Sequence, residues 1–254
     1  MSGAAVHVVA AAVIDAVGRV LIAQRPPGKH LAGSWEFPGG KLESGEARAL
    51  GLARELREEL GIAIREPRPL IRVRHTYTYG EVLIDMWVVA RYQGEPEGLD
   101  GQALRWCRPD ELAAADLLPA DKPIVRALRL PERLTEAATP YYCVSGLESL
   151  LGREGAEAGD AAGGNGRLRG VACVNTAHAV AAAAAGARAD FLVLSQTLPA
   201  EELAALCQQV PVPVYACGVG LEQAWALGAS GLNEIAACRR GPENRGSNPE
   251  WTES

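Results

Sequence analysis

The sequence predicts an α/β protein in two parts of different class. In the first half, short apolar strand-like runs surround one amphipathic helical segment, which is typical of an α+β domain with a mixed sheet. In the last third, strand-like and helical segments alternate, which indicates parallel βα units. A stretch without apolar periodicity separates the two. We therefore expect domains over 1–132 and 171–238, an irregular linker over 133–170 and a disordered tail over 239–254.

The elements of the first part follow from apolar periodicity and from glycine and proline punctuation. Strands are expected over 4–14 and 20–24, followed by a proline- and glycine-rich loop. A helix is expected over 46–60, because apolar residues recur there at three- and four-residue steps and Gly61 ends the run. The remaining expectations are strands over 70–79, 82–92 and 103–107, and short helices over 110–115 and 122–130.

The last part contains at most five strand-like runs. Four of them are VACV, DFLVL, VPVYA and GLNEI, and helices are expected between them over 177–187, 199–208 and 221–227. Because strands that alternate with helices at this spacing pair side by side in the same direction, we expect a parallel sheet.

Composition and charge exclude several function classes. The chain has 254 residues, 48% of them apolar, and 25 Lys and Arg against 31 Asp and Glu, a net charge of −6. Stable nucleic-acid binding is therefore not expected. The longest apolar runs are shorter than the roughly 20 residues of a membrane span, and no basic residue precedes the first, so neither a span nor a secretory signal is expected. Six cysteines without CxxC spacing favour a cytoplasmic location.

The helical segment over 46–60 carries three glutamates on one side. Glu55, Glu58 and Glu59 stand at i, i+3 and i+4. Like charges at this spacing destabilise a helix, and nothing basic separates them on that face, so a bound cation is the expected compensation. A set of oxygen ligands suits Mg²⁺, or Mn²⁺, better than Zn²⁺. The alternative, a solvated acidic helix face, is the commoner origin of such a string.

A wider pattern favours the metal site. Residues 40–62 fill every position of the Nudix box, GX5EX7REUXEEXGU with U aliphatic. A chance match in such a chain is below about one in a million. Its other fixed residues, expected to be structural, are Gly40, Glu46, Arg54 and Gly61. Arg54 can pair with Glu58, and Glu46 lies near the helix start. The sequence thus resembles the Nudix hydrolases.

The resemblance to MutT-type members of that family covers about residues 6–130. It implies an α/β/α sandwich and an Mg²⁺-dependent attack of water on the β-phosphorus of a nucleoside triphosphate, a small-molecule substrate. The implied reaction is hydrolysis of 8-oxo-dGTP to 8-oxo-dGMP and pyrophosphate, in nucleotide-pool sanitation and DNA repair.

The resemblance also implies residue roles. The metal ligands would be Glu55, Glu58, Glu59 and the carbonyl of Gly39. Glu55 is the first choice for the general base, with Asp100 second. The substrate-binding positions would be Arg25, His30, Glu36, Phe37, Pro38, Gly39 and Asp121. His30 stays open between binding and an ordinary loop position.

Asp121 departs from the MutT pattern, which has asparagine after a Pro-Ala pair. An amide both donates and accepts, whereas an ionised carboxylate only accepts. Recognition of the O6 carbonyl of the oxidised purine would therefore require a protonated Asp121 or another donor. We expect Asp121 to accept from the N7–H that 8-oxoguanine has and guanine lacks.

The last part resembles the C-terminal half of thiamine-phosphate synthase-like TIM barrels, through DFLVLS, PVPVYACGVG and GASGLNEI. The resemblance implies phosphate binding at Gly218 and Gly220. About 115 residues are too few for eight βα units, so we expect a partial barrel without synthase activity. Its open sheet edges favour a homodimer through this region.

Two other functions stay open. One is Nudix hydrolysis of a different nucleoside diphosphate derivative, and the other is a nucleotide or thiamine-phosphate sensor. The intact set of three glutamates argues against a pure sensor.

Overall fold

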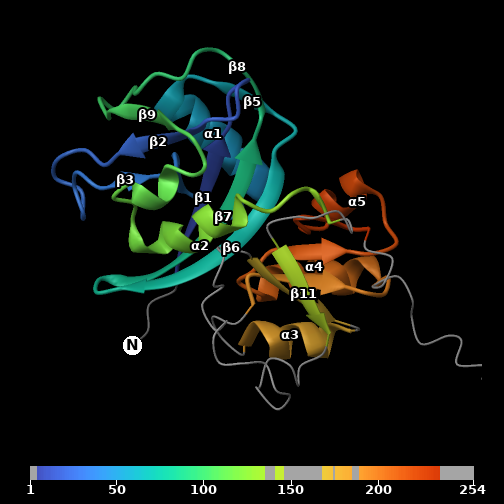
Figure 1. Ribbon diagram of the computed structural model, residues 1–254. Helices are drawn as coiled ribbons and strands as arrows, with labels where there is room; N and C mark the ends of the chain where they lie inside the picture. Colours follow the sequence, from blue (N-terminus) through green and yellow to red (C-terminus); the bar gives the residue numbers. More distant parts are fainter. Residues whose placement is uncertain (1–4, 135–140, 146–167, 174, 185–188, 235–254) are drawn as a thin grey trace, which may run out of the picture.

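The computed structural model describes residues 5–134, 141–145, 168–173, 175–184 and 189–234. Figure 1 shows an N-terminal part beside a C-terminal part. The expected disordered tail, and most of the expected linker, lie outside the described residues. No helix in the described ranges is long and apolar enough to cross a membrane.

The N-terminal part is built on a mixed four-stranded sheet of order β4-β1-β7-β6. Strand β1 (Val6–Val13) runs parallel to β7 (Gly80–Val89) and antiparallel to β4 (Gly39–Lys41), and β6 (Arg68–Tyr77) pairs antiparallel with β7 as the edge strand. A second sheet contains β3 (Trp35–Glu36), β2 (Val20–Gln24) and β9 (Leu104–Cys107), and β5 (Ala63–Arg65) pairs with β8 (Arg91–Gln93). The expected mixed sheet is confirmed.

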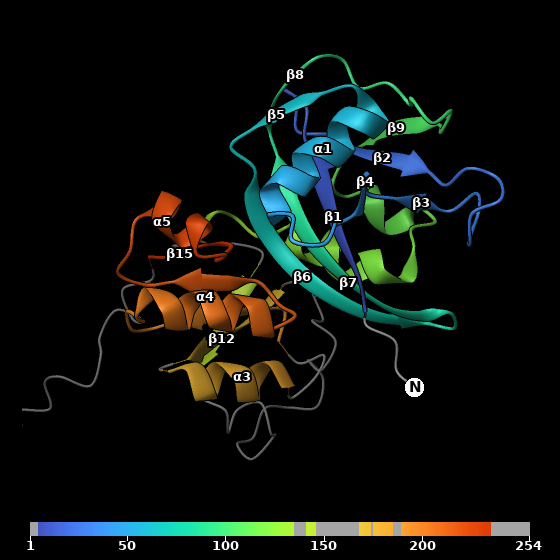
Figure 2. The same cartoon turned by 180° about the vertical axis from the view of Figure 1, so that it is seen from behind.

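Helices cover both faces of the four-stranded sheet because β1 is apolar on both sides. Val9, Ala11 and Val13 pack against the leucines of α1 (Arg48–Leu60). Ala10 and Ala12 belong to a cluster on the other face, with residues of α2 (Lys122–Ala127) and of η1 (Leu112–Ala114). A short helix η2 (Pro119–Asp121) leads into α2. Figure 2 shows α1 lying across the strands.

Helix α1 begins two residues later than the sequence predicts and ends where expected. Glu46 stays outside the helix because its carboxylate accepts from the backbone N–H of Glu43 and from Arg54. At the other end Gly61 has φ 71°, in the left-handed region that favours glycine, and its N–H donates to the carbonyl of Arg57.

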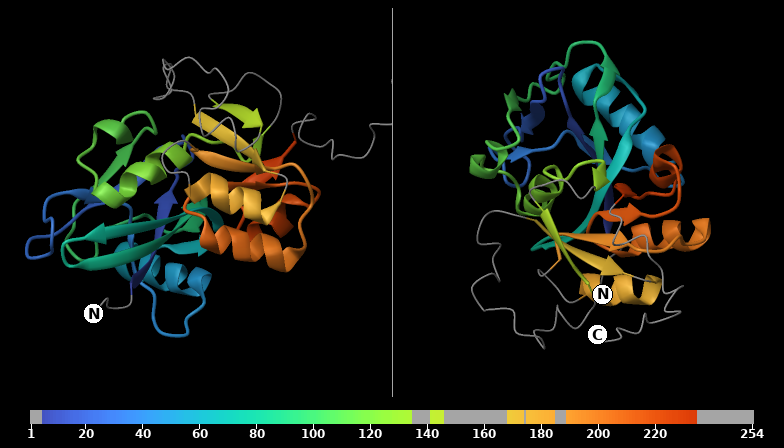
Figure 3. Two further views of the ribbon diagram at one scale, coloured as in Figure 1. Left: turned by 90° about the horizontal axis from the view of Figure 1, so that it is seen from below. Right: turned by 45° about the vertical axis from the view of Figure 1, so that its right-hand side comes forward.

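The C-terminal part is a parallel sheet of order β10-β15-β14-β13-β12-β11, and its parallel arrangement agrees with the predicted alternation. Its strands are β10 (Arg133–Leu134), β11 (Tyr141–Ser145), β12 (Leu168–Cys173), β13 (Phe191–Leu194), β14 (Val214–Ala216) and β15 (Gly231–Asn233). Its helices are α3 (Thr176–Ala184), α4 (Ala200–Gln209) and α5 (Leu221–Ala226) (Figure 3).

This sheet corrects one expectation. Strands β10 and β11 and the start of β12 fall within the range expected to be an irregular linker, whereas the five strands described after Pro140 agree with the expected maximum of five. A strand of two residues has no readable period, and β10 is ordered by pairing with β15, which is distant in sequence. Within the described residues β10 and β11 are not paired, so a closed barrel is not observed.

A core prediction follows from the two faces of α1. Leu56 is fully buried, whereas Leu50 on the same helix is 67% exposed. Leu56→Ala is expected to lower the free energy of unfolding by about 2–5 kcal/mol, because it leaves a cavity between α1 and the sheet. Leu50→Ala, the matched control, should change it by less than about 0.5 kcal/mol. Equal effects of the two variants in urea unfolding would contradict this packing.

Candidate active site

Two glycines let β4 pass close to both β1 and α1. A Cβ atom built on Gly39, whose φ is 148°, would fall on the backbone carbonyl oxygen of Val9. A Cβ atom on Gly40 would fall on the carboxylate of Glu55. Only glycine fits at position 39, because backbone atoms stand in the way, whereas a side chain at position 40 would displace the Glu55 carboxylate from β4.

Arg54 binds the other charged residues of the motif. Its guanidinium donates to both oxygens of Glu46, at 3.0 and 2.9 Å, and to Glu55 Oε1 at 2.9 Å. It also donates to Glu58 Oε2 at 3.2 Å, the i, i+4 pair predicted from the sequence. The expectation that nothing basic lies among the glutamates is therefore wrong, since a long arginine side chain reaches carboxylates one and four residues away.

Glu59 turns toward β4 instead. Its Oε2 accepts from the backbone N–H of Gly39 at 3.1 Å. Burial, together with the nearby charges of Glu36 and Glu55, raises the pKa of Glu59 to about 7. Without a cation beside it, this carboxyl group is about half protonated at neutral pH.

Four residues predicted from the sequence line one small cavity: Glu36, Pro38, Glu59 and Asp100. Its volume of about 10 Å³ is the size of one water molecule or ion, far smaller than a nucleotide. Lys29 and Gln102 also line it, and the sequence analysis did not single them out. Gln102 belongs to the GLDGQ string and fixes the loop, because it donates to the Glu59 carbonyl at 3.1 Å and accepts from the Asp100 N–H at 2.9 Å.

Arg25 and Glu36 form an ion pair at the rim of this region. Burial raises the pKa of Glu36, and the charge of Arg25 opposes that rise. Arg25 Nε also donates to the carbonyl of His30 at 2.8 Å, so this pair anchors the loop that precedes β3.

His30 lies in an aromatic cluster that the sequence analysis missed. Its ring packs edge-on against Tyr79, with centroids 4.6 Å apart, and Tyr79 stacks on Tyr77 at 5.0 Å. The two tyrosines sit at the turn between β6 and β7, in the string HTYTY. The alternation of polar and aromatic residues in this string predicts a strand. The position of the tyrosines beside residues 30 and 121 depends on the tertiary fold, which the sequence pattern does not show.

Asp121 is buried, with 4% of its surface exposed. The backbone N–H of Phe37 donates to its carboxyl group, while Oδ2 has no hydrogen-bond partner among the described residues. Burial, and then the charge of Glu36, raise the pKa of Asp121 well above its usual value. Burial therefore favours the protonated form of this side chain, which can donate as well as accept.

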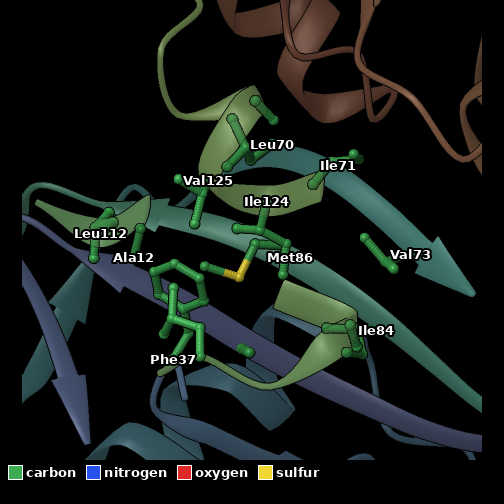
Figure 4. Packing of buried hydrophobic residues seen from close by; sticks show 14 of the residues in the cluster. Ala12, Phe37, Leu70, Ile71, Val73, Ile84, Met86, Leu112, Ile124 and Val125 are labelled. Carbon is green, nitrogen blue, oxygen red and sulfur yellow. The ribbon is translucent and has the colours of Figure 1, made fainter. Parts of the chain in front are cut away.

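Phe37 corrects an expectation. Its side chain is 4% exposed and packs in the core cluster with Met86 and Ile124, as Figure 4 shows. The ring is therefore a core residue, because it packs among apolar side chains of the sheet and of α2. Phe37 contributes to the site through its backbone N–H. The carbonyl of Pro38 is similarly occupied by the N–H of Ala11, at 2.9 Å.

The candidate ligand atoms are of the type that a hard divalent cation binds. All the candidate ligands are oxygen atoms, and the raised pKa of Glu59 marks a place where positive charge is in short supply. In the described part of the chain, however, no three His, Cys, Asp or Glu side chains are grouped closely enough to hold a metal ion. To bind an ion, Glu55 and Glu58 would have to give up their hydrogen bonds with Arg54.

The raised pKa of Glu59 predicts a pH-dependent stability. The folded chain holds this proton up to a pH of about 7 and the unfolded chain only to about 4.5, so the folded state loses stability as the pH rises across that window. In metal-free buffer at pH 8, Glu59→Gln should raise the free energy of unfolding by on the order of 1–3 kcal/mol, and this gain should fade near pH 4.5.

The control for that measurement is Glu58→Gln, because the Glu58 side chain is 60% exposed. It should change stability little at any pH in the same urea titrations. A Glu59→Gln variant that is no more stable than the wild type at pH 8 would contradict the described environment of this carboxyl group.

Comparisons with known proteins agree on the N-terminal part. The family model described as NUDIX domain matches residues 9–127. A CTP pyrophosphohydrolase of Escherichia coli (strain K12) is 39% identical over 119 residues, which are 47% of this chain and 88% of that protein. An 8-oxo-dGTP diphosphatase of the same strain is 34% identical over 110 residues, 43% of this chain and 85% of that protein.

A solved structure from a structure and function analysis of MutT from Aliivibrio salmonicida and Vibrio cholerae is 32% identical, with a TM-score of 0.43. The match covers 48% of this chain and 95% of the chain in that structure. This chain covers most of the length of both sequence relatives. Its own residues 40–62 form a complete Nudix box. Through its N-terminal part, this chain belongs to the Nudix family.

Proposed function

We propose that this Nudix hydrolase converts 8-oxo-dGTP into 8-oxo-dGMP and pyrophosphate, with Mg²⁺ as its metal. The observation that carries the proposal is the small cavity where Glu36, Glu59 and Asp100 meet beside Gly39. An ion-sized space lined by carboxyl groups suits a metal-bridged triphosphate better than a neutral ligand. The relatives named 8-oxo-dGTP diphosphatase support the choice of substrate.

The proposed ligands are Glu55, Glu58, Glu59 and the carbonyl of Gly39. A divalent ion bound there would polarise the phosphoryl oxygens and acidify the attacking water. A cation held there would favour the ionised form of Glu59, because it would supply the positive charge that the surroundings of this carboxyl group lack. Arg54 holds Glu55 and Glu58 close to the site until then.

In the reaction, Glu55 accepts a proton from the water whose oxygen attacks the β-phosphorus. The bond from the β-phosphorus to the oxygen that bridges it to the α-phosphorus breaks, and the monophosphate leaves with that oxygen. Asp100 is the second candidate for the base, since it lines the cavity next to Glu59. Lys29, on the same cavity, neutralises phosphate charge.

Base recognition falls to Asp121. In its protonated form it can donate to the O6 carbonyl through its hydroxyl group and accept N7–H through its carbonyl oxygen. The raised pKa supports this role, because protonation supplies the donor that the asparagine of the MutT pattern would provide. The stacked rings of Tyr77 and Tyr79 offer a flat surface for the base nearby.

A second candidate substrate is CTP, because a relative named CTP pyrophosphohydrolase is 39% identical to this chain. A neutral carboxyl group that both donates and accepts can pair with the edge of a pyrimidine as well as a purine. The cytoplasmic location, the phosphate role of Gly218 and Gly220, the thiamine-phosphate synthase resemblance and the homodimer remain predictions from the sequence.

The first experiment measures pyrophosphate release from 8-oxo-dGTP, dGTP and CTP with Mg²⁺. Glu55→Gln should lower kcat by about 10²–10⁴-fold, because it removes the proposed base and a ligand. Glu66→Gln, which changes an exposed glutamate outside the site, should leave kcat unchanged. Faster release from CTP than from 8-oxo-dGTP would mean that CTP is the preferred substrate. Full activity of Glu55→Gln would contradict the proposed role of Glu55 as base and metal ligand.

Asp121 gives a separate test of selectivity. Asp121→Asn keeps a donor and an acceptor at every pH, whereas wild-type Asp121 loses its donor as the pH rises through its raised pKa. The value of kcat/KM for 8-oxo-dGTP should therefore decline toward high pH in the wild type and persist in the variant, whereas the preference over dGTP, which depends on the acceptor for N7–H, should be kept in both. The substrate's own titration affects both proteins equally, so parallel pH profiles would rule out this role.

A further inference from the structure

The two parts of the chain meet along the edge strand β6. Arg72 Nη1 donates to the carbonyl of Gln208, at the end of α4, at 3.0 Å. The Ser230 hydroxyl group donates to the carbonyl of Leu70 at 2.6 Å, and accepts from the N–H of Val214 at 3.3 Å. Figure 2 shows α4 and α5 on the β6 side of the N-terminal part.

A cavity of about 60 Å³ lies within this contact. Residues of α1, β6 and β7 line one side of it, and residues of α4, α5 and β14 line the other. By volume it can hold a few water molecules or one small ion. It is separate from the cavity at Glu59, with which it shares no lining residue.

The one carboxylate in this cavity is already saturated. Asp85 is 5% exposed and accepts from His7 Nε2 at 2.5 Å, from Arg48 Nη1 at 3.2 Å, and from Arg72 Nε and Nη2 at 2.7 and 2.9 Å. These arginines also hold its pKa low despite burial, so it stays ionised. The Gln208 and Leu70 carbonyl groups are occupied as well.

The groups without partners are donors. The indole N–H groups of Trp87 and Trp225 are buried and have no hydrogen-bond partner among the described residues, and both tryptophans line the cavity. A buried N–H group without a partner costs about 1–3 kcal/mol, so an acceptor that pairs with these groups would bind favourably. Arg48 uses one N–H on Asp85, and a guanidinium offers several more.

Charge points the same way. Arg48 and Arg72 carry two positive charges against the single negative charge of Asp85, before His7 is counted. Cys207 adds no negative charge, because burial raises the pKa of its thiol to about 12. A ligand that suits this cavity therefore accepts hydrogen bonds and carries negative charge.

We propose that this cavity between β6–β7 and α4–α5 binds a small inorganic oxyanion of the phosphate class through the indole N–H groups of Trp87 and Trp225 and the guanidinium group of Arg48. Each part of the chain supplies one tryptophan, so the anion binds only when the parts are docked, and it stabilises their contact. Arg48 is the first residue of α1, the helix that carries the catalytic glutamates.

The test titrates the full chain with inorganic phosphate in metal-free buffer, following calorimetry and the indole ¹H–¹⁵N resonances. Saturable binding at one site should shift two indole resonances, which the variants Trp87→Phe and Trp225→Phe assign by their loss. Each variant keeps an aromatic ring but loses the N–H, and each should weaken binding about tenfold or more.

Trp106→Phe, on β9 and away from the cavity, is the control and should bind phosphate like the wild type. Thermal unfolding checks that each variant is folded. Absence of saturable binding, or wild-type affinity in both Trp87→Phe and Trp225→Phe, would mean that the cavity holds only water. Phosphate binding at the catalytic site is distinguished by its loss in Lys29→Ala, which should leave binding at the tryptophans intact.

Discussion

The site depends on the close approach of β4 to β1 and α1, which the absence of side chains at residues 39 and 40 allows. Gly39 passes over the backbone of Val9, and Gly40 passes over the carboxylate of Glu55. This approach brings the N–H of Gly39 within hydrogen-bond distance of Glu59. It also fixes the distance between the sheet and the helix that carries the charged residues. The apolar layer of α1 and β1 holds that distance, so packing sets the geometry of the charges.

The N-terminal part places many carboxyl groups close together and limits their repulsion in two ways. Where the carboxylates are within reach of Arg54, the arginine shares its N–H groups among Glu46, Glu55 and Glu58. Where burial excludes such a partner, it raises the pKa of Glu59 and Asp121 and so favours their uncharged forms. Both ways are reversible, because a cation can displace either an arginine or a proton. A metal-dependent enzyme requires this reversibility.

Local pattern was enough to predict the long elements and the motif. Strand β2 lies where its apolar run placed it, and α1 ends at the predicted Gly61 because helix periodicity and left-handed glycine are properties of neighbouring residues. The pattern could not place Tyr77 beside Asp121 or order β10 through β15, since both depend on residues far apart in sequence. Phe37 was misjudged for the same reason, because its ring meets residues of other elements in the core.

The way in which β6 is covered bears on solubility. This ten-residue edge strand carries backbone groups that could pair with another chain. The C-terminal part does not extend the sheet. It lays side chains over the edge, and the Ser230 hydroxyl group occupies the carbonyl of Leu70. In a chain that ended before α4 the carbonyl of Leu70 would lose this partner, and the edge of β6 would be more exposed to pairing with another chain.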